Sequence, residues 1–133
     1  MAGAFDVLFI IYSFSKVIFM IHKLEYNFGD CKINVEGKLW TISSWHVSEE
    51  YRNSGLGTRM LKSLVLEIIE TCGEPNEVRY IWNGQNAYVK KWLDRFEARC
   101  MVDVNVAKKA PDDDWESHMY VLNRDKFLEY CRG

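Results

Sequence analysis

A short stretch at residues 49–61, E-E-Y-R-N-S-G-L-G-T-R-M-L, places Gly55 and Gly57 where a helical apolar pattern begins. Glycine is a poor helix former, so these positions indicate a local requirement of the backbone. Without Cβ atoms a ligand can approach the backbone closely, and successive N–H groups at a helix N-terminus bind anions. Arg52 adds a permanent positive charge at the same end. The stretch therefore predicts a phosphate-binding loop.

Two familiar nucleotide motifs do not fit this loop. A P-loop needs Gly-Lys-Ser/Thr at the start of the helix, whereas Gly57 is followed by Thr58 and Arg59. The dinucleotide-binding pattern needs a third glycine, and Met60 stands at that position. The sequence therefore argues against a nucleoside triphosphate and against a dinucleotide as the ligand.

The run Arg52-Asn53-Ser54-Gly55-Leu56-Gly57 follows W-H-V-S-E-E-Y and precedes an amphipathic helix. This R-x-x-G-x-G pattern resembles the acetyl-CoA signature of the GNAT superfamily of N-acetyltransferases, closely over residues 38–73 and loosely as far as residue 98. The alternative, a plain strand-to-helix turn with two chance glycines, is disfavoured because strand, arginine and helix all match. The resemblance implies that the backbone from Arg52 to Thr58 binds the CoA diphosphate, while Trp45 and Val47 at the strand end pair with the pantetheine arm.

A second family pattern, N-x-x-A followed by L-Y-x-K/R-x-G-F, is only partly matched. Asn86 falls on the family's asparagine, a cofactor-binding position, and Arg95 also matches. Leu93 occupies the place of the usual tyrosine, which often protonates the departing CoA thiolate, and Glu97-Ala98 replaces Gly-Phe. Tyr88 is close in sequence but on a different helix face. It is interpreted either as the catalytic acid or as a packing aromatic residue.

The reaction implied by the resemblance is direct attack of a primary amine on the thioester of acetyl-CoA. The Val47 N–H is the family-equivalent donor to the carbonyl oxygen. His46 is a candidate catalytic base, although strand alternation places it opposite Trp45 and Val47, so a structural histidine is the alternative.

An acidic run with a tryptophan lies near the C-terminal end of the chain and is a candidate acceptor site. In the family, the loop between the last two strands borders the acceptor cleft, so the run is expected to attract a cationic amine, small molecule or protein. The alternative is a solvated loop. The residues concerned are Asp112, Asp113, Asp114 and Trp115.

Length and charge limit the class of protein. The 133 residues fit one domain, 1–133, with room for a core. The formal net charge of −2 argues against a nucleic-acid partner bound by a broad basic face. The N-terminal run Val7–Tyr12 is too short for a membrane span, and polar residues at Ser13, Ser15 and Lys16 interrupt the next apolar segment. Buried strands are therefore expected, and no membrane partner.

Four cysteines are spread along the chain, at Cys31, Cys72, Cys100 and Cys131. They form no C-x-x-C pair, and the three histidines are not at zinc-ligand spacing. Free thiols, no metal and a reducing, cytoplasmic location are therefore expected.

The elements that position these residues can be predicted from hydrophobic patterning. Residues 7–12, 17–25 and 38–47 have the composition of strands in an antiparallel meander. An apolar stripe from Leu56 to Ile69 predicts a helix, with Gly73 just beyond its end. Further segments predict a strand at 77–82, a helix at 86–96, and strands at 100–106 and 117–123. The order predicts an α+β domain with a mixed sheet flanked by helices.

The family normally carries a strand and two helices before the meander, so this chain resembles a trimmed form. Two alternatives to an acetyltransferase remain open at this point. One is a CoA-binding module without catalysis, and the other is a small interaction protein whose N-terminal strands form a homodimer.

Overall fold

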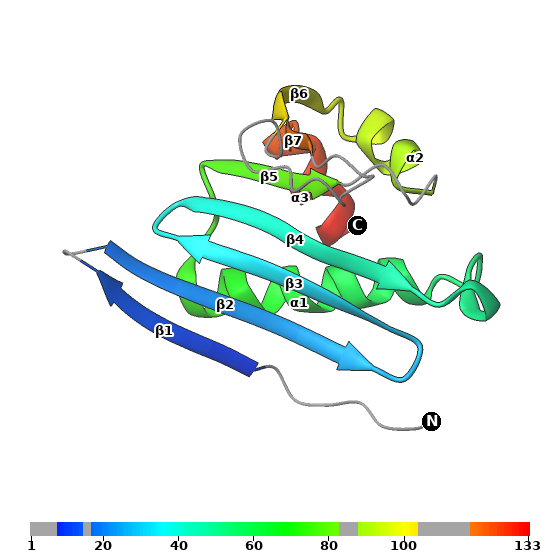
Figure 1. Cartoon of the computed structure of the whole chain (residues 1–133), viewed down its shortest axis with the longest axis horizontal. Coiled ribbons are helices and arrows are strands. Elements are labelled where there is room, and N and C mark those ends of the chain that lie inside the picture. The colour runs from blue at the N-terminus through cyan, green and yellow to red at the C-terminus, as the bar shows by residue number, and fades with distance from the viewer. Residues whose placement is uncertain (1–7, 15–16, 83–87, 104–117) are drawn as a thin grey trace, which may run out of the picture.

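A computed structural model describes residues 8–14, 17–82, 88–103 and 118–133 (Figure 1). Four consecutive strands form the first half of the sheet: β1 (Leu8–Phe14), β2 (Val17–Tyr26), β3 (Gly29–Glu36) and β4 (Leu39–Val47). Each pairs antiparallel with the next. The predicted meander is therefore confirmed.

Helix α1 (Leu56–Cys72) crosses from the end of β4 to the start of β5 (Glu77–Trp82), which runs parallel to β4. One stripe of α1 is fully buried against the sheet, and it consists of Met60, Leu61, Leu64, Val65 and Ile68. The helix ends as predicted at Gly73, whose φ of +85° is left-handed and whose N–H donates to the Ile69 carbonyl at 2.8 Å. The 3₁₀ turn η1 (Glu49–Tyr51) lies between β4 and α1.

The second half of the chain adds α2 (Tyr88–Arg95), β6 (Arg99–Asp103) and β7 (His118–Val121). In the described residues the sheet has seven strands in the order β1-β2-β3-β4-β5-β7-β6. Strand β7 pairs antiparallel with both β5 and β6. The parallel β4–β5 pair among antiparallel neighbours makes this the mixed sheet of an α+β fold, as predicted.

A third helix, α3 (Arg124–Arg132), is not predicted from the sequence. Asn123 caps it, because its side-chain oxygen accepts a hydrogen bond from the Lys126 N–H at 3.1 Å. Phe127, Leu128 and Cys131 are buried, so the helix closes the core beside α1 (Figure 1). The sequence pattern extends the last strand to residue 123, whereas β7 ends at Val121.

The core lies between the sheet and its helices. Trp40, Ile33 and Ile42 are at most 1% exposed on the sheet side. Phe96 and Phe127 are at most 2% exposed on the helix side. The four cysteines of the chain are free thiols, of which Cys31 and Cys131 are buried.

Candidate functional site

Strands β4 and β5 separate before either one ends. Their parallel pairing stops at Ile42 and Tyr80, while β4 continues to Val47 and β5 to Trp82. The register between β3 and β4 also shifts, so Ser43 is an extra residue in β4. A bulge of this kind bends its strand. The last half of β4 therefore presents an edge that β5 does not cover.

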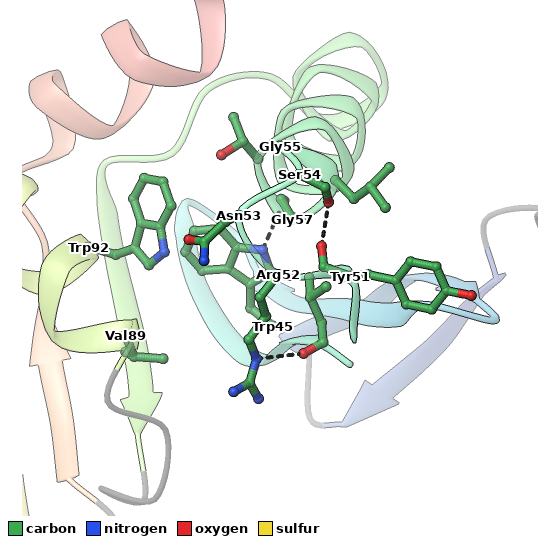
Figure 2. A pocket seen from close by; sticks show the side chains of 12 residues that line it. Trp45, Tyr51, Arg52, Asn53, Ser54, Gly55, Gly57, Val89 and Trp92 are labelled. Carbon is green, nitrogen blue, oxygen red and sulfur yellow. Dashed lines mark hydrogen bonds between the residues drawn. The ribbon is translucent and has the colours of Figure 1, made fainter. Parts of the chain in front are cut away.

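A cavity of about 280 Å³ lies at this end of β4 (Figure 2). Its wall is formed by the end of β4, the loop that follows, the first turn of α1 and one side of α2. The lining residues are Trp45, Val47, Tyr51, Arg52, Asn53, Ser54, Gly55, Leu56, Gly57, Thr58, Val89 and Trp92. The structure thus brings together Trp45, Val47 and the whole predicted loop from Arg52 to Thr58.

The two glycines of the loop serve different geometric needs. Gly55 precedes α1 with a φ of +81°, a left-handed conformation that side chains with a Cβ rarely adopt, and a Cβ there would meet open space. Gly57 lies in the first turn of α1, where a Cβ would be 3.0 Å from Val47 Cγ2 and 3.6 Å from Trp45 Nε1. Gly55 therefore lets the chain turn, and Gly57 lets α1 approach β4 closely.

The first backbone N–H groups of α1 make no hydrogen bond within the helix. The first hydrogen bond of the helix runs from the Arg59 N–H to the Gly55 carbonyl at 3.0 Å. No side chain caps this N-terminus. Within the part of the chain that the structure describes, the amides of Leu56, Gly57 and Thr58 consequently have no acceptor, and the helix dipole adds positive charge beside them. Such an arrangement binds phosphate.

Arg52 is fixed to the end of β4. Its Nε–H donates to the Val47 carbonyl at 3.1 Å (Figure 2). Its own backbone N–H is used within η1, where it donates to the Glu49 carbonyl at 3.2 Å. Arg52 therefore contributes its side chain to the cavity, whereas its amide is not among those left for a ligand.

The backbone direction at Val47 can be derived from its neighbour. The Ser48 N–H donates to the Phe28 carbonyl at 2.7 Å, on the β3 side of the strand. Because successive residues of a strand direct their polar groups to alternate sides, the Val47 N–H and carbonyl point to the side that β5 has left. The Arg52 side chain occupies that carbonyl, which is consistent with this direction.

Two tryptophans line the cavity and lie against each other. Trp45 is 8% exposed, and its indole N–H donates to the Gly57 carbonyl at 3.0 Å. Trp92 of α2 lies 5.0 Å from Trp45 between ring centroids. Behind them, burial raises the pKa of the Tyr80 phenol, so this hydroxyl keeps its proton at neutral pH.

Several residues at the cavity are missed by sequence reasoning. The sequence indicates Trp92 only as a core residue and gives Val89 no role, yet their spacing of three places both on one helix face. Tyr130 is missed because its helix is not predicted. Its hydroxyl lies 2.7 Å from the Thr58 hydroxyl, so α3 contacts the first turn of α1.

The remaining predicted site residues lie elsewhere or outside the described residues. His46 is exposed on the face of β4 opposite Trp45 and does not line the cavity, so its role as a base stays a prediction. Tyr88 is the first residue of α2, and its side chain lies outside the described part. The same holds for the whole of the segments that contain Asn86 and the acidic run Asp112, Asp113, Asp114 and Trp115.

The described residues show neither a metal-binding cluster nor a membrane-spanning helix. No group of three or more His, Cys, Asp or Glu side chains in those segments is arranged to hold a metal ion. None of the helices described is long and apolar enough to cross a membrane.

No family model and no curated protein matches this sequence, but solved structures share its fold. Nourseothricin acetyltransferase superposes with a TM-score of 0.57 and 11% identity, covering 90% of this chain and 85% of that one. The ribosomal-protein-S18-alanine N-acetyltransferase from Escherichia coli gives 0.54 and 14%, covering 83% and 70%. Arabidopsis thaliana NAA60, solved in complex with acetyl-CoA, gives 0.53 and 14%, covering 79% and 74%. The chain therefore has the fold of the GNAT acetyltransferases, which confirms the fold implied by the loop motif.

Proposed function

We propose that this protein, which has the GNAT fold, is an N-acetyltransferase that moves the acetyl group of acetyl-CoA to a primary amine. The observation that carries the proposal is the cavity at the open end of β4. Its lining combines the unused amides at the start of α1 with the Arg52 side chain, as a diphosphate requires. The acetyl-CoA complex of the similarly folded NAA60 supports the choice of cosubstrate.

In the proposed complex, the diphosphate of acetyl-CoA accepts hydrogen bonds from the amides between Gly55 and Thr58. The pantetheine arm lies along the uncovered edge of β4, past Trp45 and Val47, and uses the polar groups that β5 leaves unpaired. Asn86 is proposed to contact the same arm. A cavity of about 280 Å³ suits this part of the cosubstrate, so the adenosine end extends beyond it.

The proposed reaction breaks the C–S bond of the thioester and forms a C–N bond to the amine. The Val47 N–H donates to the carbonyl oxygen as its charge develops, since it points to the side that β5 has left. The amine nitrogen loses one proton, and the thiolate of CoA gains one on leaving. No oxidant or metal is needed for this balance.

Two side chains are proposed for the proton transfers. Tyr88 begins the helix on which Val89 and Trp92 line the cavity, so it is the candidate acid for the thiolate. His46 is the candidate base, and because it lies on the opposite face of β4 it would act through water. The acidic run with Asp112, Asp113, Asp114 and Trp115 is proposed to attract the cationic amine.

A second candidate function is a CoA-binding module without catalysis. The observation that favours it is Leu93, which stands where the family usually has an acid tyrosine and is 6% exposed in the core. No hydroxyl from that position of α2 can reach the thiolate. Binding would be the same for both candidate functions, and only turnover would differ.

Thermal unfolding with acetyl-CoA, followed by turnover, tests the proposal. A ligand at about 100 times its Kd should stabilise the fold by about 2.7 kcal/mol. Arg52→Leu should lose most of this stabilisation, whereas Arg99→Leu, on the exposed edge strand β6, should retain it. A screen of primary amines and peptides with labelled acetyl-CoA should then find acetylated product.

Two results would contradict the proposal at different points. If the unfolding temperature does not change even at a high concentration of acetyl-CoA, both CoA-dependent functions are contradicted. If acetyl-CoA binds normally but no amine raises the release of CoA above the uncatalysed rate, the protein is a CoA-binding module without catalysis.

A further inference from the structure

Three helices bring two positive charges onto one aromatic ring. Lys62 of α1 has its Nζ 5.1 Å from the centroid of the Tyr130 ring, and Arg95 of α2 has its Cζ 4.9 Å from the same centroid. Tyr130 itself comes from α3. Arg95 also lies 5.8 Å from the centroid of Trp92, a residue that lines the cavity. The three residues are far apart in sequence, so only the fold assembles them.

Among the residues that the structure describes, these two charges have no acidic partner. In the described segments, the ion pairs are made by other basic residues, and neither Lys62 nor Arg95 has a carboxylate within 4.0 Å. An aromatic face attracts cations, but two cations at one ring repel each other. A nearby anion would offset this repulsion, and a phosphomonoester with nearly two negative charges at neutral pH suits two cations.

The position of the pair relative to the cavity identifies the anion. The Tyr130 hydroxyl shares a 2.7 Å hydrogen bond with the Thr58 hydroxyl. Thr58 belongs to the cavity lining and follows the amides to which the diphosphate is assigned. Lys62 lies one helical turn further along the same side of α1. The cationic pair is therefore next to the proposed diphosphate site, where α3 meets the first turn of α1.

We propose that Lys62 and Arg95, gathered on the Tyr130 ring, bind the phosphomonoester on the ribose of coenzyme A. This inference rests on the proposed function, because it assigns the second phosphate group of the same cosubstrate. The ring fixes the direction of both cations before the ligand arrives, which reduces the side-chain entropy lost on binding. The subsite selects CoA over its dephospho form, which lacks only this phosphate.

The test is isothermal titration of the full chain with CoA and with dephospho-CoA. The wild type should bind CoA about tenfold or more tightly than dephospho-CoA, as expected for charge-assisted hydrogen bonds to one phosphate. Lys62→Met and Arg95→Met should each lower this ratio severalfold, and the double variant should bring it near one. Lys90→Met, which removes an exposed cation of α2 elsewhere, should leave the ratio unchanged.

The ratio separates recognition of the phosphate from general damage to the fold, since a loosened site would weaken both ligands equally. A wild-type ratio near one would overturn the subsite while leaving the proposed function in place. A ratio that Lys90→Met lowers as much as Lys62→Met would also overturn it, because net charge would then explain the preference. Absence of binding by either ligand would overturn this inference and the proposed function together.

Discussion

Gly55 and Gly57 show how neighbouring residues of one type can serve two physical needs. The spacing of glycines in the sequence predicts a phosphate-binding loop, and the structure separates a left-handed backbone at Gly55 from a close helix–strand contact at Gly57. The sequence could not make this distinction, because the contact partners of Gly57 are Val47 and Trp45, about ten residues earlier. Their approach depends on how the strand and helix pack.

Alanine substitution at each glycine should separate the two needs. Gly55→Ala should lower the free energy of unfolding by about 1–2 kcal/mol, because the left-handed conformation is unfavourable for alanine. Gly57→Ala should change it less, since the gain in helix propensity of about 1 kcal/mol offsets the 3.0 Å contact with Val47. Urea denaturation measures both. If Gly55→Ala is as stable as the wild type, the left-handed backbone at this position does not require glycine.

A hydrogen bond between Thr58 and Tyr130 links α3 directly to the first turn of α1. A double-mutant cycle with Thr58→Val and Tyr130→Phe isolates it, because Phe keeps the ring that Lys62 and Arg95 contact. The coupling should be about 1 kcal/mol in unfolding free energy. A coupling indistinguishable from zero would mean that the two hydroxyls do not depend on each other.

At the scale of elements, local pattern decides what the sequence can predict. Helix α1 is predicted because its apolar stripe is long and Gly73 ends it. Helix α3 has only nine residues, with buried Phe127, Leu128 and Cys131, and its clearest sequence signal is the Asn123 cap. A short helix depends on tertiary packing more than on propensity, so a strand ending at Asn123 is the simpler interpretation of the sequence.

Just beyond α2, Glu97 has an unfavourable backbone conformation but a side chain that makes favourable contacts. Glu97 has a φ of +48°, at the position where the family pattern has glycine. Its carboxylate lies 2.8 Å from Lys126 Nζ and accepts from Asn123 Nδ2 at 3.3 Å, which joins α2 to α3. Because exposed ion pairs contribute little, Glu97→Gly should raise the melting temperature, whereas Glu97→Ala should lower it. A lower melting temperature for both would show that the ion pair dominates.

The contact between β2 and the end of α1 predicts a dependence of stability on pH. His22 is 3% exposed, and its Nε2 lies 3.9 Å from Cys72 Sγ. Burial lowers its pKa below the ordinary value of 6.5, so the folded protein keeps the neutral form while the unfolded chain takes up a proton. The contribution of His22 to the unfolding free energy should therefore be constant above about pH 7 and fall as the pH drops below 6.5, by at most about 1.4 kcal/mol per pH unit.

The variant His22→Leu provides the control for this pH dependence. It should remove the slope between about pH 7 and pH 5, which urea denaturation at each pH measures. The carboxyls of Glu74 and Glu97 also have lowered pKa values, through hydrogen bonds and ion pairs to basic side chains, and their contribution is lost only in more acidic solution. If the unfolding free energy changes equally with pH in the wild type and in His22→Leu, other titratable groups cause the pH dependence.

At the scale of the molecule, the sequence predicts the fold class and the loop but not the complete site. The motif locates the residues from Arg52 to Thr58, because they are contiguous. The far wall, Val89 and Trp92, and the supporting Tyr130 come from later helices that reach the cavity only after folding. The insertion of β7 between β5 and β6 is likewise not predicted, because strand order depends on pairing between distant segments.

The proposed function depends above all on the backbone amides between Gly55 and Thr58 binding the diphosphate of acetyl-CoA. Amide ¹H–¹⁵N spectra recorded during titration with acetyl-CoA give the sharpest test, because each amide of the loop reports separately. We predict saturable downfield proton shifts, largest at Leu56, Gly57 and Thr58, with small changes on β1 and β6. Saturable binding that leaves those three amides unshifted would contradict the assignment of the diphosphate to this loop.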